Sequence, residues 1–106
     1  MKKRIKVLLA ELKQGLIATY GSRLKGVYLF GSYARGEEDQ ESDVDVLIVL
    51  DGFERYGVEV DRTSDLIAGL SLEYSVSISR VFVSEKDWKN QESAFLANAR
   101  EEAVAA

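Results

Sequence analysis

Two aspartates separated by one residue, Asp43 and Asp45, are the side chains with the clearest chemical potential in this sequence. They open an apolar run that ends at Leu50 and is typical of a buried strand, in which residues i and i+2 point to the same face. Two carboxylates so close repel each other unless a cation bridges them or one is protonated. Mg²⁺ commonly combines one or two carboxylates with substrate phosphates. We therefore predict that Asp43 and Asp45 are catalytic residues that bind Mg²⁺, in a site for one ion or two.

A glycine-rich turn lies just upstream of this acidic pair. Gly31 and Ser32 follow an apolar run and offer backbone N–H groups and a hydroxyl at one point, and glycine lets a ligand approach the backbone closely. Groups of this kind favour anions, phosphate above all. Arg35 can pair with phosphate through two parallel hydrogen bonds, or with a local carboxylate such as Glu37 or Asp39. The turn therefore predicts a nucleotide or phosphate site at Gly31, Ser32 and Arg35.

Ser42 directly precedes the acidic pair. It either caps the start of the strand or holds an acid in place, and we count it with the nucleotide-binding residues. The alternative for the aspartates is a solvated edge strand that carries no ligand. The Gly-Ser turn, the Arg-Gly step and the D-x-D pair together favour a metal and phosphate site over that alternative.

The composition limits the available chemistry. The 106 residues include no histidine and no cysteine, so catalysis must use carboxylates, hydroxyls, Lys, Arg or a metal held by oxygen. The length suits a single domain, residues 1–106. The net charge of −4 argues against a broad surface for nucleic acid. No apolar run approaches the roughly 20 residues that span a bilayer, and the lack of cysteine fits a cytoplasmic protein.

Hydrophobic periodicity predicts the elements that must position these residues. It predicts helices over 2–20 and 56–72, strands over 26–30, 43–50 and 74–83, and a closing helix with Ser84 as its N-cap. We expect Ile17 and Leu72 among the core positions, and fraying of residues 103–106. The order α-β-β-α-β-α predicts an α/β (α+β) domain with helices packed on one small mixed sheet.

The segment GSYARG, from Gly31 to Gly36, followed by SDVD, from Ser42 to Asp45, resembles the GS-x-A-R-G…S-D-x-D signature of the DNA polymerase beta-like nucleotidyltransferase superfamily. The short chain is most similar to the minimal nucleotidyltransferases, and its element order suits their fold. The resemblance implies that the Gly-Ser turn holds the triphosphate of a nucleotide and that the two aspartates ligate Mg²⁺. It implies transfer of a nucleoside monophosphate, most often AMP from ATP, onto a hydroxyl, with release of pyrophosphate.

The resemblance also implies partners. Minimal nucleotidyltransferases are often encoded beside a HEPN-type partner protein, and such pairs can act as antitoxin and toxin, with AMP added to the toxin. A homodimer is another way to cover exposed apolar surface. Neither partner is visible in the residues themselves.

A third carboxylate is expected on the long strand that follows the pair, because active members of the superfamily usually carry one there. The strand expected over 74–83 contains no acid, and Ser77 and Ser79 stand at the expected positions. Glu73, Asp61 on the preceding helix, or a carboxylate from a partner could complete the site. Otherwise the protein binds nucleotide and metal but transfers poorly, or it is chiefly a partner-binding antitoxin module.

Overall fold

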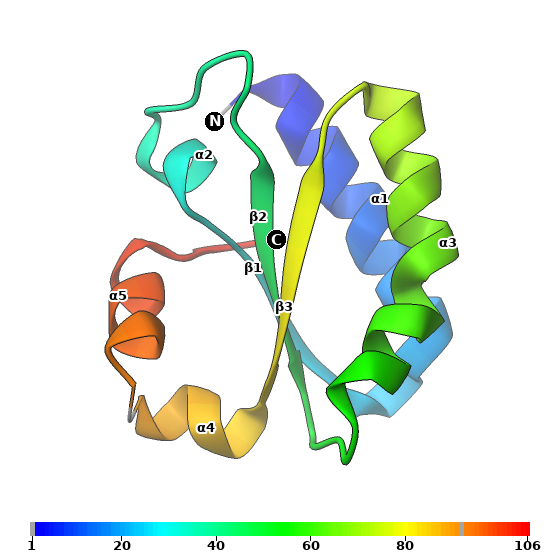
Figure 1. The fold of residues 1–106 in the computed structure, drawn as a ribbon, viewed down its shortest axis with the longest axis vertical. Helices are drawn as coiled ribbons and strands as arrows, with labels where there is room; N and C mark the ends of the chain where they lie inside the picture. The colour runs from blue at the N-terminus through cyan, green and yellow to red at the C-terminus, as the bar shows by residue number, and fades with distance from the viewer. Residues whose placement is uncertain (1, 92) are drawn as a thin grey trace.

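The computed structural model describes residues 2–91 and 93–106, and it places one sheet between two layers of helices (Figure 1). The strands are β1 (Leu24–Phe30), β2 (Val44–Leu50), β3 (Ile78–Ser84) and β4 (Val104–Ala105), in the spatial order β3-β2-β1-β4. β1 runs antiparallel to both β2 and β4, whereas β2 and β3 run parallel. The predicted mixed sheet with helices packed on it is therefore confirmed.

The helices differ in detail from the predicted order. The helices α1 (Lys3–Tyr20) and α3 (Tyr56–Tyr74) cover one face of the sheet, and α4 (Glu85–Asn90) and α5 (Ala94–Glu102) cover the other (Figure 1). The closing helix is thus two helices, and the chain gains a short helix α2 (Ser32–Arg35), a 3₁₀ turn η1 (Gly21–Arg23) and the strand β4. Over residues 2–91 and 93–106, no helix is both long enough and apolar enough to cross a membrane.

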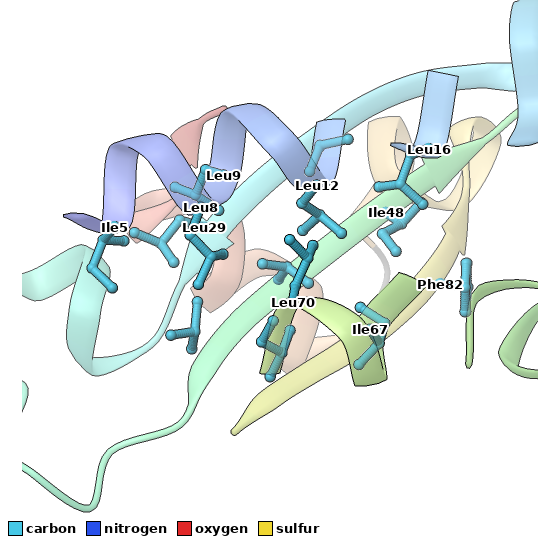
Figure 2. Close-up of a cluster of buried hydrophobic side chains, with 14 of the residues drawn as sticks. Ile5, Leu8, Leu9, Leu12, Leu16, Leu29, Ile48, Ile67, Leu70 and Phe82 are labelled. Atoms are coloured by element: carbon cyan, nitrogen blue, oxygen red, sulfur yellow. The ribbon is translucent and has the colours of Figure 1, made fainter. Parts of the chain in front are cut away.

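The larger core fills the space between the sheet and the helices α1 and α3 (Figure 2). Burial on α3 follows a spacing of three and four residues, so Leu72, two residues beyond the buried Leu70, lies about 200° around the helix and is 82% exposed. Ile17 likewise turns away from its buried neighbour Leu16 and is 44% exposed. The two predicted core positions are therefore wrong. The α1 residues that do enter this core are Ile5, Leu8, Leu9, Leu12, Leu16 and Tyr20.

The smaller core lies on the opposite face, under α4 and α5. Leu47 and Val49 of β2 enter it, and the ring of Trp88 stacks at a tilt on Tyr28 with 5.1 Å between the ring centroids. Every residue of β2 except Asp45 is buried, as expected for a central strand that is covered on both faces.

The third strand begins four residues later than predicted. α3 continues through Tyr74, and Ser75 then adopts a left-handed conformation, with φ 53° and ψ 47°, and donates its N–H to the Ser71 carbonyl as a C-terminal cap. The expected strand over 74–83 therefore starts at Ile78. The alternating pattern of residues 74–77 belongs to the helix end and its turn.

The C-terminal residues form an edge strand, so the predicted fraying of 103–106 is wrong. Val104 pairs with Leu29 and Ala105 with Tyr28, and the Ala106 N–H donates to the Val27 carbonyl at 2.9 Å. The open edge of β1 carries backbone groups that need partners, and β4 satisfies some of them.

Candidate functional site

The two aspartates lie where β2 begins. Asp45 alternates with the buried Val44 and Val46, so it projects from the sheet face that carries Leu47 and the smaller core. It is half-buried, whereas Asp43, just before the strand, is exposed. Burial raises the pKa of the Asp45 carboxyl, and the negative charge of Asp43 raises it further. A cation held between the two side chains would relieve both costs, so this donor set fits Mg²⁺.

Gly31 brings the predicted phosphate turn against Asp45. It ends β1 with φ 75° and ψ −157°, a conformation that side-chain-bearing residues avoid. A Cβ on Gly31 would collide with the Asp45 carboxylate, whose Cγ would lie only 3.1 Å away. The backbone of the turn and a metal-binding candidate therefore share one small space that only glycine leaves open.

The turn itself is rigidly built. The N–H groups of Ala34 and Arg35 donate to the Gly31 carbonyl at 3.0 and 3.1 Å and close the single helical turn of α2. Gly36 follows in the left-handed region, with φ 72° and ψ 23°, and reverses the chain. Tyr33 and Ala34 pack on the larger core, which fixes the turn to the sheet and leaves Ser32 half-buried beside Gly31.

Arg35 lies between two carboxylates. Its Nε donates to Glu37 at 3.0 Å, the local partner foreseen from the sequence, and its Nη1 donates to Glu102 at 2.9 Å. These two hydrogen bonds, the one to Glu102 first, raise the pKa of the guanidinium, so Arg35 is a permanent cation at the turn. The arginine therefore braces the turn through both carboxylates in this structure.

Glu102, the last residue of α5, is the site residue that sequence reasoning missed. Its Oε1 accepts the Gly31 N–H at 2.8 Å while its Oε2 accepts from Arg35. The Gly31 hydrogen bond and then the Arg35 hydrogen bond lower the pKa of Glu102. The Glu102 charge also raises the pKa of Asp45, so the two carboxylates lie within electrostatic reach of each other. No signal in the sequence marks this contact, because it joins residues 71 positions apart.

Ser42 holds the loop that precedes the acidic pair. Its hydroxyl accepts the Asp39 N–H at 2.9 Å and donates to the Asp39 carboxylate, while that carboxylate accepts the Glu41 N–H. Of the alternatives for Ser42, this arrangement fits a serine that holds an acid in place, but the acid is Asp39 of the loop and not Asp43 or Asp45.

The structure does not bring Glu73 to Asp45. Glu73 is exposed on α3 beside Glu11 of α1, and the hydrogen bond with Glu11, then desolvation, raises its pKa. In the parallel register of β2 and β3, the residue beside Asp45 is Ser79. Within residues 2–91 and 93–106, no group of three or more His, Cys, Asp or Glu side chains is placed to hold a metal ion. The position where a third carboxylate was expected therefore carries a hydroxyl.

A polar cavity of about 440 Å³ opens beside Asp43. It lies between the loop before β2 and the turn that joins α3 to β3, and the exposed Leu72 stands at its wall. Its lining is rich in hydroxyl groups, from Ser42, Ser71, Ser75 and Ser77. The cavity and the phosphate turn lie on either side of the acidic pair.

Comparison with known proteins shows the family to which the chain belongs. The sequence profile of the nucleotidyltransferase domain matches residues 2–101. The chain therefore belongs to the nucleotidyltransferase domain family.

Its relatives include two proteins of Methanocaldococcus jannaschii. "Putative protein adenylyltransferase MJ0604" is 42% identical over 76 residues, which are 72% of this chain and 70% of that protein. "Putative protein adenylyltransferase MJ0141" is 36% identical over 74 residues, which are 70% of this chain and 74% of that protein.

Two crystal structures have a similar fold. A structure described as a "putative nucleotidyltransferase" from Sulfolobus solfataricus has a TM-score of 0.58 at 24% identity, over 99% of this chain and 86% of that one. A "toxin-antitoxin with AMP-PNP" has a TM-score of 0.58 at 16% identity, over 89% of this chain and 68% of that one. These likenesses show the nucleotidyltransferase fold alone.

Proposed function

We propose that this protein is a Mg²⁺-dependent adenylyltransferase that moves AMP from ATP onto a hydroxyl group of a protein. The observation that carries the proposal is the packing of Gly31 against Asp45, since it joins the turn predicted to bind phosphate to a carboxylate predicted to bind metal in one space. The relatives named as protein adenylyltransferases support the choice of AMP and of a protein acceptor.

Each residue of the site has a role in this proposal. The Gly31 N–H and the Ser32 hydroxyl donate hydrogen bonds to the triphosphate, and Arg35 adds a permanent positive charge. Asp43 and Asp45 are the residues that would hold Mg²⁺. Bound there, the ion would supply positive charge to the phosphates and a lower pKa for the attacking hydroxyl. That hydroxyl forms a bond to the α-phosphorus, the bond to pyrophosphate breaks, and the hydroxyl proton passes to solvent.

The acceptor that we propose is a HEPN-type toxin, with this protein as its antitoxin. Support comes from the toxin–antitoxin complexes among the structures of similar fold, one of them crystallised with AMP-PNP. The polar cavity beside Asp43 offers room for an acceptor side chain next to the acidic pair. A homodimer is the alternative assembly, and it would leave the acceptor to another protein.

A second candidate function is a non-catalytic antitoxin that neutralises its partner by contact. The observation that favours it is Ser79, which lies beside Asp45 where an acid was expected. A hydroxyl cannot supply a carboxylate's negative charge, so the site binds its ions more weakly than a three-acid site would.

A labelling experiment separates the two functions. The protein and its neighbouring gene product are incubated with Mg²⁺ and ATP labelled at the α-phosphate, and in parallel with ATP labelled at the γ-phosphate. Adenylyl transfer predicts α-label on the partner and no γ-label. The D43N/D45N variant should abolish the label, whereas E54Q/D65N, which removes the same charge from two exposed positions, should not. Neutralisation without label that persists in D43N/D45N would refute the enzyme.

A gain-of-function variant sharpens this test. Ser79→Asp places a carboxylate beside Asp45 in the register of the two strands. If the missing charge limits transfer, S79D should raise the initial rate about tenfold or more and lower the Mg²⁺ concentration needed for half-maximal rate. An unchanged rate in a folded S79D protein would count against a site limited by its third acid.

A further inference from the structure

The Glu102 carboxylate occupies the donors that the proposed function assigns to the triphosphate. One of its oxygens accepts the Gly31 N–H at 2.8 Å and the other accepts from the Arg35 guanidinium at 2.9 Å. Carboxylate and phosphate oxygens are alternative anionic acceptors for these same donors. A single N–H cannot make a short, straight hydrogen bond to both at once. Glu102 and a phosphate oxygen therefore exclude each other at Gly31.

Few interactions hold Glu102 and the residues that follow it to the rest of the fold. Beyond it, the chain is held to β1 by the two-residue strand β4, whose residues are both exposed, and by the hydrogen bonds of Ala106. The body of α5 has separate anchors, because Ala99 is buried and Arg100 donates to the Trp88 carbonyl at 2.9 Å. Ala103 and Ala106 touch the smaller and the larger core, and the Ala106 carbonyl accepts from Lys13 at 3.0 Å, but none of residues 102–106 is fully buried. Residues 102–106 can therefore leave the turn with only marginal loss of core packing, as expected for a short edge segment of low local stability.

We propose that Glu102 is an internal competitor of the nucleotide, and that triphosphate binding displaces Glu102 and loosens residues 102–106 from the edge of β1. The proposal rests on the proposed function, which assigns the Gly31 and Arg35 donors to the triphosphate. When a binding-competent state is only partly populated, the apparent affinity falls by the populated fraction. The closed segment thus lowers nucleotide affinity, and anything that holds the C-terminal segment away from β1 raises it.

Calorimetric titration with AMP-PNP and Mg²⁺ tests the competition. Glu102→Gln keeps the shape of the side chain but removes its charge, and Glu102→Ala removes the acceptor altogether. The matched control is Glu101→Gln, at the exposed neighbouring residue of the same helix. We expect AMP-PNP to bind E102Q and E102A about tenfold more tightly than the wild type, and E101Q with wild-type affinity. Thermal melts of all four proteins establish that each is folded.

Hydrogen exchange gives a second readout that a purely structural glutamate would not move. Saturating AMP-PNP should speed exchange at the amides of Val104 to Ala106 in the wild type, while in E102A these amides should be fast already. Equal affinity in the wild type and both Glu102 variants, with exchange unaffected by nucleotide, would overturn the competition and leave the proposed function standing. Weaker binding in E102Q would identify Glu102 as a positioning residue for Arg35 and also overturn it. No binding to any folded variant would overturn the proposed function as well.

Discussion

Replacing Gly31 by alanine perturbs the backbone and the Asp45 carboxylate together. The conformation at φ 75° and ψ −157° is open essentially to glycine alone, and imposing it on alanine costs about 1–3 kcal/mol. The added methyl group also meets the Asp45 carboxylate, and overpacking of this kind typically costs about 1–3 kcal/mol. The two costs add, so we expect G31A to lower the free energy of unfolding by about 2–6 kcal/mol.

Gly36→Ala is the matched control for this change. Gly36 also has a positive φ, of 72°, but a Cβ there would meet no atom within 4 Å. G36A should therefore lose only the backbone contribution, about 1–2 kcal/mol. Urea denaturation of both variants, analysed with a common slope, measures the difference.

The Mg²⁺ dependence of the proposed transfer should distinguish the same two variants. In G31A the Asp45 carboxylate must move to make room, so the Mg²⁺ concentration for half-maximal adenylyl transfer should rise several-fold, whereas G36A should keep the wild-type Mg²⁺ dependence. If G31A is no less stable than G36A, the close contact of Gly31 with Asp45 is refuted. If G31A is less stable but its metal dependence is unchanged, Asp45 is not a metal ligand.

Three further predictions test the charges around the fold. Asp45→Asn should raise the free energy of unfolding in metal-free buffer, by less than about 1 kcal/mol, while abolishing transfer, since the raised pKa of Asp45 makes its ionised form unfavourable in the folded state. Tyr20→Phe should cost about 1–3 kcal/mol in urea denaturation, because the Tyr20 hydroxyl donates to the buried Glu59 at 2.8 Å. Partial burial and the hydrogen bond to Glu11 raise the pKa of Tyr74 to about 12, so its stabilising contribution is full below pH 10 and is lost as the pH rises towards 12. In Tyr74→Phe that alkaline loss should shrink, as measured by denaturation at pH 9, 10, 11 and 12.

The part of the site that the sequence predicts is the part that is local in the chain. Gly31, Ser32 and Arg35 lie at one turn, and Asp43 and Asp45 lie on either side of Val44 where β2 begins, so their spacing in the sequence brings each set together. The strand β2 is equally predictable because burial on both faces gives a continuous apolar run.

Features that depend on distant partners are not predictable in this way. Glu59 and Thr63 are polar residues on the buried face of α3. Their burial is possible because the Tyr20 hydroxyl donates to Glu59 and Arg80 donates to Thr63 at 2.8 Å. The start of β3 at Ile78 depends on where α3 ends, and the serine alternation before it is compatible with a strand as well as with a cap. Glu102 is the extreme case, since only the folded chain brings it to Gly31.

The position of Glu102 bears on how the proposed nucleotide and metal would bind. The site contains Asp43, Asp45 and Glu102, with Arg35 as the cation that contacts Glu102. A triphosphate that displaces Glu102 gains the Gly31 and Arg35 donors but brings its negative charge towards the two aspartates, which costs free energy without a cation between them. Glu102 brings one negative charge and is tethered, so it is tolerated without metal, whereas the more highly charged nucleotide is not. We therefore expect nucleotide to displace Glu102 only together with a divalent cation. The replacement of the Glu102 carboxylate by the triphosphate would then depend on both ligands at once.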